Sequence, residues 1–230
     1  MDKYEIVRKV EEFAPLENQE AWDCSGWAVN VNRYDEISKI MLCLTVTDDV
    51  IHQAKEQNCD MIISHHPLFF IPIEWKDINV YCSHTNLDKS IGGTTDTLIK
   101  NLGLAQYKTN FEHDFLRIIE YKTTLDDFSK IIKTISPNAR VVNNRNIKTL
   151  DKIAFCAGSG SEFIAKAAES GADCLVTGDL KFHTSLESPI VLYDIGHFES
   201  EILVLPVFKH LIGTGIEIIY AREKSPFEPI

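Results

Sequence analysis

A strand–helix–strand pattern that occurs twice in the 230-residue chain is the feature that most constrains the fold. Residues 39–64 and 152–177 each contain an apolar run, an amphipathic segment and a second apolar run. The two stretches align at a constant offset of 113 residues, which places Cys43 on Cys156 and Asp60 on Asp173. Segments of this length form a βαβ unit with a parallel strand pair, so the sequence predicts an α/β fold.

The match continues beyond the second strand of each half. At the same offset His84 falls on His197 and Asp88 falls on Glu201, so HTNLD and HFESE share the pattern H-x-x-x-[D/E]. We interpret these matches as an internal duplication, although any two βαβ units can be aligned to some extent. We therefore expect two duplicated strand–helix–strand halves related by pseudo-two-fold symmetry. In chain order they are residues 1–110, a connecting strand–helix–strand at 111–150, and residues 151–230.

Length and charge narrow the class of protein. A chain of this length forms one compact domain or two small ones. The formal net charge of −11 disfavours nucleic-acid binding, which needs a basic surface, unless a local basic patch exists. No apolar run is long enough to span a bilayer, and the charged, amphipathic N-terminus is unlike a signal peptide. These features predict a cytoplasmic protein without a membrane partner.

The six cysteines include no C-x-x-C pair, which argues against a thiolate zinc finger. Four of them lie in apolar runs that resemble strands. We expect these four to be small buried hydrophobic residues in a reducing compartment.

Two adjacent histidines end an apolar run in the segment MIISHHPLFF. Successive residues of a regular strand point to opposite faces, so His65 and His66 cannot both reach one pocket while the strand stays regular. Pro67 cannot donate a ladder hydrogen bond, and it biases His66 toward an extended conformation. We therefore expect the chain to leave the sheet here, so that the two imidazoles serve neighbouring positions.

Histidines and carboxylates gather at the ends of several predicted strands, where ligands of α/β proteins bind. The candidates are His65, His66, His84, Asp88, His197 and Glu201. A mixed histidine and carboxylate set without thiolates suits zinc, manganese, iron, nickel or cobalt. Because the set exceeds what one tetrahedral zinc needs, it predicts two divalent ions per chain, bridged by a carboxylate, at a site between the two halves.

Each candidate also has an ordinary structural interpretation. A single histidine at a strand end is more often a core or surface residue than a ligand. Asp88 could be a turn residue, and Glu201 could lie on an exposed helix face with Glu199 as a competitor for its role. The joint occurrence of the candidates is what favours a metal site.

The glycine-rich segment AGSGSEF, residues 157–163, precedes a predicted helix. Its backbone amides could bind a phosphate. A tight turn between a strand and a helix is the alternative that we favour.

These motifs together resemble those of the Nif-three-like family, whose members are often named GTP cyclohydrolase I type-two homologues. The resemblance extends from about Trp22 to SPF at 225–227, and it is carried by IISHHPLFF, HTNLD with the later GG, AGSGSEFIAKAAESGADCLVTGDLKFH and DIGHFESE. It implies a two-part α/β fold, a dinuclear metal site and a toroidal homohexamer. The ligands that it implies are His65, His66, Asp88, His197 and Glu201, with His84 near the site. The chain departs from the family pattern in WDCSGW and at Thr45, where an aspartate is common.

The hypothesis from sequence is a metal-dependent hydrolase in which two divalent ions activate a bridging water. His84 or Asp179 could position this water or transfer a proton, and Asp179 is the repeat equivalent of His66. The small-molecule substrate could be a nucleotide, another phosphate compound or a cyclic amide. The alternative is a metal-binding scaffold or interaction protein without turnover. An open coordination position would favour catalysis.

Overall fold

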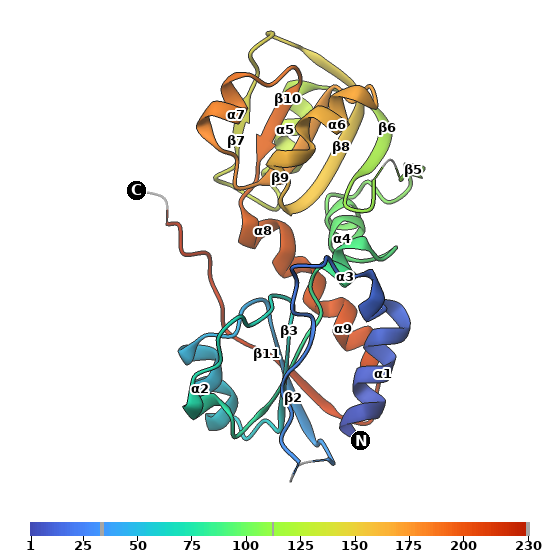
Figure 1. Cartoon of the computed structure of the whole chain (residues 1–230). Coiled ribbons are helices and arrows are strands. Elements are labelled where there is room, and N and C mark those ends of the chain that lie inside the picture. Colours follow the sequence, from blue (N-terminus) through green and yellow to red (C-terminus); the bar gives the residue numbers. More distant parts are fainter. Residues whose placement is uncertain (33–34, 112, 229–230) are drawn as a thin grey trace. The chain divides into compact units, whose positions relative to one another are not determined.

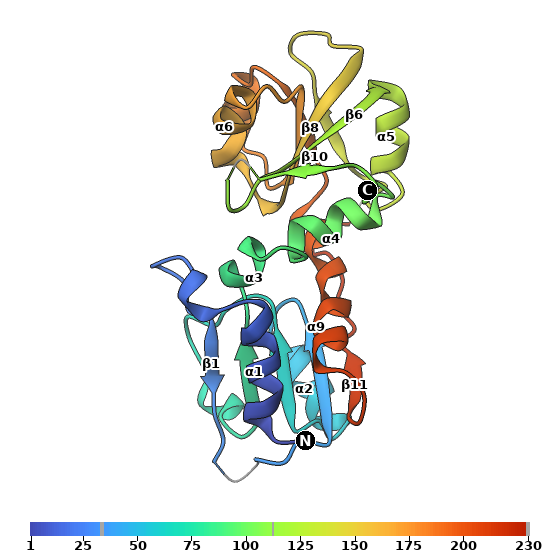
Figure 2. The ribbon, with the colours of Figure 1, turned by 90° about the vertical axis from the view of Figure 1, so that its right-hand side faces the viewer.

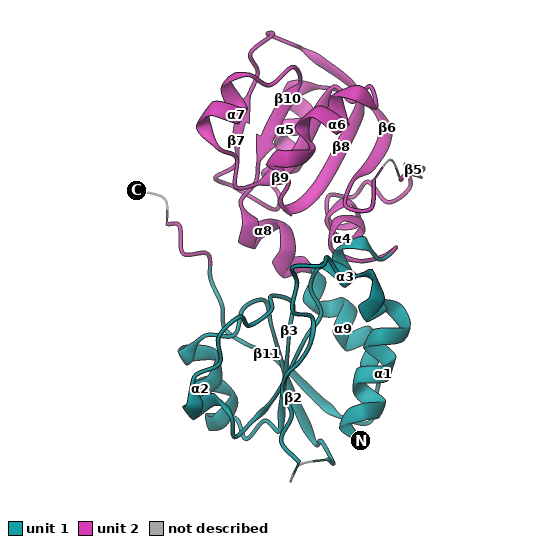
Figure 3. Cartoon of the chain, in the orientation of Figure 1, with its two compact units in different colours: residues 1–90, 204–224 teal, residues 91–203, 225–230 magenta. Residues whose placement is uncertain are grey.

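The computed structural model describes residues 1–32, 35–111 and 113–228. The chain forms two compact units, which Figure 3 shows in different colours. The first contains residues 1–90 and 204–224, and the second contains residues 91–203 and the C-terminal residues from 225. The chain-order segments expected from sequence differ from these units, because a late strand pairs with an early one in the first sheet.

The first unit is a five-stranded sheet with helices on both faces. Its strands lie in the order β1-β4-β3-β2-β11, and all neighbours are parallel except β1 and β4. Within this unit α2 covers one face, and α1 and α9 lie side by side on the other (Figures 1 and 2). The bounds are β1 Gly26–Val29, β2 Lys39–Cys43, β3 Met61–Ser64, β4 Asn79–Cys82, β11 Glu217–Tyr220, α1 Lys3–Phe13, α2 Asp48–Glu56, α3 Thr85–Lys89 and α9 Leu205–Ile212.

The second unit is a six-stranded mixed sheet in the order β5-β6-β8-β9-β10-β7. Its three central strands β8, β9 and β10 are parallel, and the outer strands are antiparallel to their neighbours. The bounds are β5 Thr109–Asn110, β6 Arg117–Thr124, β7 Arg140–Val142, β8 Thr149–Ser159, β9 Cys174–Gly178, β10 Val191–Asp194, α4 Thr94–Asn101, α5 Leu125–Ile132, α6 Ile164–Glu169, α7 Phe182–Leu186 and α8 His197–Glu201.

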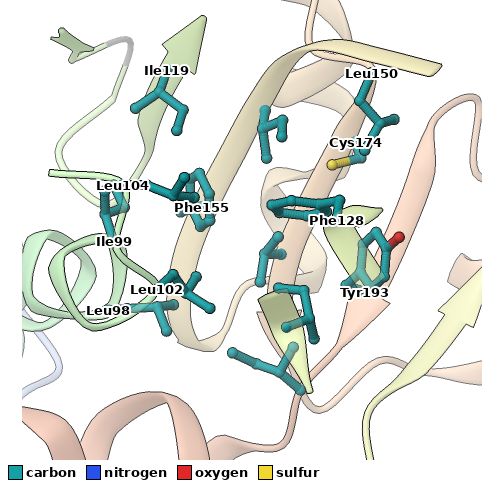
Figure 4. Close-up of a cluster of buried hydrophobic side chains, with 14 of the residues drawn as sticks. Leu98, Ile99, Leu102, Leu104, Ile119, Phe128, Leu150, Phe155, Cys174 and Tyr193 are labelled. Atoms are coloured by element: carbon teal, nitrogen blue, oxygen red, sulfur yellow. The ribbon is translucent and has the colours of Figure 1, made fainter. Parts of the chain in front are cut away.

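Alternating side chains of the second sheet fill two separate cores. Phe155 of β8 packs with Phe128 of α5 and Tyr193 of β10 in one core (Figure 4). Its neighbour Ala154 belongs to the other core, with Ala167 of α6. This alternation follows from the two-residue period of a strand, and it explains why the central strands are apolar on both faces.

The sequence repeat corresponds to a structural repeat. In the first unit Ile40 of β2 lies opposite Met61 of β3, and in the second Ile153 of β8 lies opposite Cys174 of β9. Both pairs have the same register at the offset of 113 residues. The prediction of two strand–helix–strand segments with parallel strand pairs is therefore confirmed.

A hydrogen-bonded turn at the start of these strands is repeated as well. One carboxylate oxygen of Asp60 accepts hydrogen bonds from the N–H groups of Ser38 and Lys39. At the equivalent positions, one carboxylate oxygen of Asp173 accepts hydrogen bonds from the N–H groups of Asp151 and Lys152. The two aspartates align in sequence because each has the same structural role. Each precedes the second strand of its strand–helix–strand unit and binds the backbone at the start of the first strand.

The offset shifts by one residue after the second strand, which corrects one prediction. Helix α3 begins at Thr85 and α8 begins at His197, an offset of 112 residues. His84 is the N-cap of α3, so its equivalent is Gly196, the N-cap of α8. The equivalence of His84 with His197, and of Asp88 with Glu201, is therefore wrong by one residue. The shared spacing survives because both patterns place two side chains four residues apart on one helix.

Among the described residues, no helix combines the length and the apolar character needed to cross a membrane.

Candidate metal centre

The first unit gathers three imidazoles at the carboxyl end of β3. His65 and His66 follow this strand, and His84 precedes α3. One ring nitrogen from each lies within 4.8 Å of the others, which is close enough to hold a metal ion. The two adjacent rings therefore lie side by side, with their centroids 5.2 Å apart.

An irregularity in the backbone explains how both adjacent rings reach the cluster. In a regular parallel strand, successive N–H groups point to opposite neighbouring strands. Here the His65 N–H donates to the Cys43 carbonyl and the His66 N–H donates to the Leu44 carbonyl, so both face the β2 side. The strand pattern ends at Ser64, and the rings are no longer on opposite faces.

His65 has a defined tautomer. Its ring Nδ1 lies 2.9 Å from the Ser83 carbonyl oxygen, which can only accept, so Nδ1 carries the proton. Nε2 is then a lone-pair nitrogen in the neutral ring, and it lies 3.5 Å from an oxygen of Asp88. Metal-binding histidines usually donate their other N–H to a carbonyl or carboxylate in this way. His65 and Asp88 therefore present ligand atoms beside each other.

His84 is oriented by Asp23, a residue that the sequence analysis did not select. An Asp23 oxygen lies 3.1 Å from His84 Nδ1, and the same carboxylate accepts from the Thr85 N–H and hydroxyl and from Ser25. Burial alone would raise the pKa of Asp23, but the Thr85 and His84 contacts lower it below its ordinary value. Burial, and then the repulsion that two protonated rings would exert on each other at His84 and His65, lower the pKa of His84, so its imidazole is neutral at pH 7.

The second unit presents His197 between two carboxylates. His197 Nε2 lies 2.9 Å from a Glu201 oxygen, and Nδ1 lies 2.7 Å from an oxygen of Asp179, which follows β9. The hydrogen bond to Glu201 raises the pKa of His197 to about 9, with Asp179 adding to this shift and burial opposing it. Glu201, rather than Glu199, is the carboxylate bonded to His197.

The glycine-rich segment makes room for Glu201. A Cβ atom at Gly158 would lie 2.1 Å from a Glu201 carboxylate oxygen, and this residue has a positive φ of +68°. The Gly158 N–H donates to Ser200, and the Gly160 N–H donates to Thr177. Because these two N–H groups already donate to side-chain hydroxyls of the protein, the structure supports a tight turn rather than a phosphate-binding loop.

A cavity of about 270 Å³ in the second unit includes His197 and Asp179 in its wall. Its charged groups are three carboxylates and two cations, since Asp194 and Glu199 also line it, Arg140 forms an ion pair with Asp194, and the raised pKa of His197 keeps this imidazole protonated in the metal-free protein. The cavity is slightly smaller than the usual size range of small-molecule sites. Its remaining lining residues are Ser136, Asn138, Ile195, Gly196, Ser225 and Phe227.

Comparisons with known proteins agree over nearly the whole chain. Residues 1–226 match the family described as Duf34/NIF3 (NGG1p interacting factor 3). A GTP cyclohydrolase 1 type 2 homolog of Clostridium perfringens is 33% identical, covering 97% of this chain and 98% of that protein. One of Methanocaldococcus jannaschii is 28% identical, covering 95% and 97%.

Two solved structures share the fold. "Reduced HcgD from Methanocaldococcus jannaschii" has a TM-score of 0.83 at 28% identity, covering 96% of this chain and 97% of that one. A Bacillus cereus protein related to NIF3 has a TM-score of 0.84 at 18% identity, covering 100% and 99%.

Proposed function

This chain belongs to the Duf34/NIF3 family, and we propose that it is a metal-dependent hydrolase with a dinuclear metal centre. The observation that carries the proposal is the cluster of three imidazoles, with Asp88 beside it, at the carboxyl end of β3. The proposed ligands are His65, His66, Asp88, His197 and Glu201.

The donor chemistry of these residues fits divalent transition metals. Imidazole nitrogens and carboxylate oxygens without thiolates suit zinc, manganese, iron, nickel or cobalt. The tautomer of His65, set by the Ser83 carbonyl, leaves Nε2 as the ligand atom. His197 and Glu201 alone are too few ligands for a metal site, so we propose that they act together with the first set.

When bound, two such ions would lower the pKa of a water to about 7 and polarise the substrate. His84 is neutral at pH 7 and bonded to Asp23, so it can take up a proton and stabilise the resulting charge. Asp179 holds the ring of His197 through Nδ1. We assign proton transfer to His84, and the orientation of His197 to Asp179.

The cavity in the second unit bears on the class of substrate. The names of the relatives suggest a nucleotide, and a cyclic amide is the other candidate. The lining of this cavity offers carboxylate acceptors together with the cationic donors Arg140 and His197, and an amide supplies both a donor and an acceptor to such groups. A cyclic amide is therefore compatible with this cavity.

We also propose that the protein is cytoplasmic, as its N-terminus and its cysteine pattern suggest, and that it assembles as a homohexamer, as the family resemblance implies. Static light scattering at micromolar concentration measures the molar mass directly. A monomeric mass of 26.1 kDa would contradict the assembly.

A substrate screen tests the hydrolase. Nucleotides, cyclic amides and phosphoesters would be assayed with added manganese or zinc, and we expect at least one turnover that His65→Ala abolishes. The matched control is His52→Ala, because His52 is exposed on α2, where its ring pairs with Glu56 at the surface. If every rate found survives His65→Ala, the hydrolase proposal fails and the metal-binding scaffold gains support.

A further inference from the structure

The imidazole of His66 is held by a short turn that follows β2. The Thr45 hydroxyl oxygen lies 2.7 Å from His66 Nδ1. The backbone of the same turn is joined to the same histidine, because the His66 N–H donates to the Leu44 carbonyl at 2.8 Å. Both the main chain and the ring of His66 are therefore fixed by residues 44 and 45.

A carboxylate from the far end of the chain holds this turn. Glu223 accepts the Leu44 N–H at 2.7 Å on one oxygen and the Thr45 N–H at 2.9 Å on the other. Hydrogen bonds to an ionised acceptor are stronger than those between neutral groups, and two bonds to one carboxylate fix the orientation of the turn relative to it. Burial raises the pKa of Glu223, while the two amide bonds and the charge of His66 oppose this shift.

The segment that carries Glu223 is fixed independently of the imidazole cluster. It follows β11, and the Ala221 N–H donates to the Leu42 carbonyl of β2. The next residue forms a reciprocal pair with α2, because the Arg222 N–H donates to Gln53 Oε1 and Gln53 Nε2 donates to the Arg222 carbonyl. The sheet and α2 therefore set the position of Glu223.

We propose that Glu223 and Thr45 are positioning residues for His66. Glu223 fixes the turn, and Thr45 engages Nδ1 of the ring, which leaves Nε2 as the atom that binds metal. This inference rests on the proposed function, since it takes His66 to be a ligand. Polar groups that orient a metal-binding histidine typically change metal affinity by about 10- to 100-fold.

A zinc titration against a competing chromophoric chelator tests the inference in the full-length protein. Thr45→Val removes the hydroxyl but keeps the shape of the side chain. Glu223→Gln leaves a single acceptor oxygen for the two backbone N–H groups of residues 44 and 45. We expect each to weaken the tightest zinc binding by about 10- to 100-fold, and Thr45→Ser to stay within about threefold of the wild type. Glu217→Gln is the matched control, because this carboxylate lies on β11 and pairs with Lys39 at the surface.

A second readout needs no metal. Nitrogen-15 NMR of the metal-free protein reports the tautomer and hydrogen bonding of the His66 ring, which we expect to be the same in wild type and Thr45→Ser and altered in Thr45→Val. Wild-type zinc affinity and ring spectrum in Thr45→Val would overturn the inference. If the wild type binds no zinc, the proposed centre fails, and the ring spectra alone decide whether Thr45 positions the His66 ring.

Discussion

His197 and Glu201 lie four residues apart on α8, with Nε2 of the imidazole 2.9 Å from a carboxylate oxygen. Asp179 contacts the other ring nitrogen at 2.7 Å. In the metal-free protein these two carboxylates favour the charged imidazolium. A metal ion bound at Nε2 must displace that proton, so metal binding and proton release are coupled at this residue.

The first prediction follows from that coupling. The pKa of His197 in the folded, metal-free protein is about 9, above the ordinary histidine value of 6.5. The contribution of protonated His197 to the stability of the folded protein is therefore fully present below pH 6.5, and it is lost as the pH rises through about 9. We expect an NMR titration of the metal-free protein to show a charged His197 at pH 8. Glu201→Gln should lower this pKa toward 6.5, whereas Glu199→Gln on the same helix should change it little.

The second prediction concerns the space that Gly158 provides. Gly158 and Gly103 both have positive φ, of +68° and +75°, but only at Gly158 would a Cβ meet the Glu201 carboxylate. Alanine at either position should destabilise the protein by about 1–2 kcal/mol in urea unfolding, since both share the backbone strain. Gly158→Ala should also move Glu201 and lower the pKa of His197. An unchanged His197 titration in Gly158→Ala would refute this role.

Local patterns predicted the strand–helix–strand repeat and the strand end at His65 and His66, because both depend on periodicity and on Pro67. Contacts between distant residues were not predictable in this way. Asp23 meets His84 across 61 positions, and Glu223 meets Thr45 across 178, so neither pair leaves a local signal.

The position of His84 and His197 shows the limit of alignment by offset. The two H-x-x-x-[D/E] patterns match in sequence, yet one begins at a helix N-cap and the other at the first helical residue. A shift of one residue before the helix leaves the spacing within each pattern unchanged. Only the strand register and the helix start reveal it.

The third prediction is that Asp23 stabilises the loop around His84. Asp23→Asn weakens the hydrogen bonds to His84 and Thr85 and should lower the free energy of unfolding by about 1–3 kcal/mol at pH 7. The folded pKa of Asp23 is lowered, so its contribution is present above its unfolded pKa of about 4 and is lost as the pH falls through the folded value. The difference from wild type should therefore narrow in acid.

Urea unfolding at pH 7 and in acid measures this difference. Asp77→Asn is the control, because Asp77 forms a half-exposed surface pair with Lys55 and should change stability by less than about 1 kcal/mol. If Asp23→Asn lowers the free energy of unfolding no more than the control does, the Asp23 contacts contribute little to stability.

The fourth prediction is that Cys24 is the fast-reacting thiol among the six cysteines. Cys24 is exposed, whereas the other five are buried. Burial raises the pKa of Cys59 and of Cys82 to about 11 and also raises the pKa of Cys43 and Cys174. A chromogenic disulfide reagent should label one thiol per native chain rapidly and six in denaturant. Rapid labelling of two or more native thiols would contradict the buried assignment.

The measurement that tests the central claim most directly is the metal content of the reconstituted protein. After incubation with zinc or manganese and removal of free metal by gel filtration, elemental analysis by mass spectrometry gives the number of ions per chain. We predict about two ions per wild-type chain, with fewer in His65→Ala and His197→Ala and an unchanged number in His52→Ala. Less than one ion per wild-type chain would contradict a dinuclear centre.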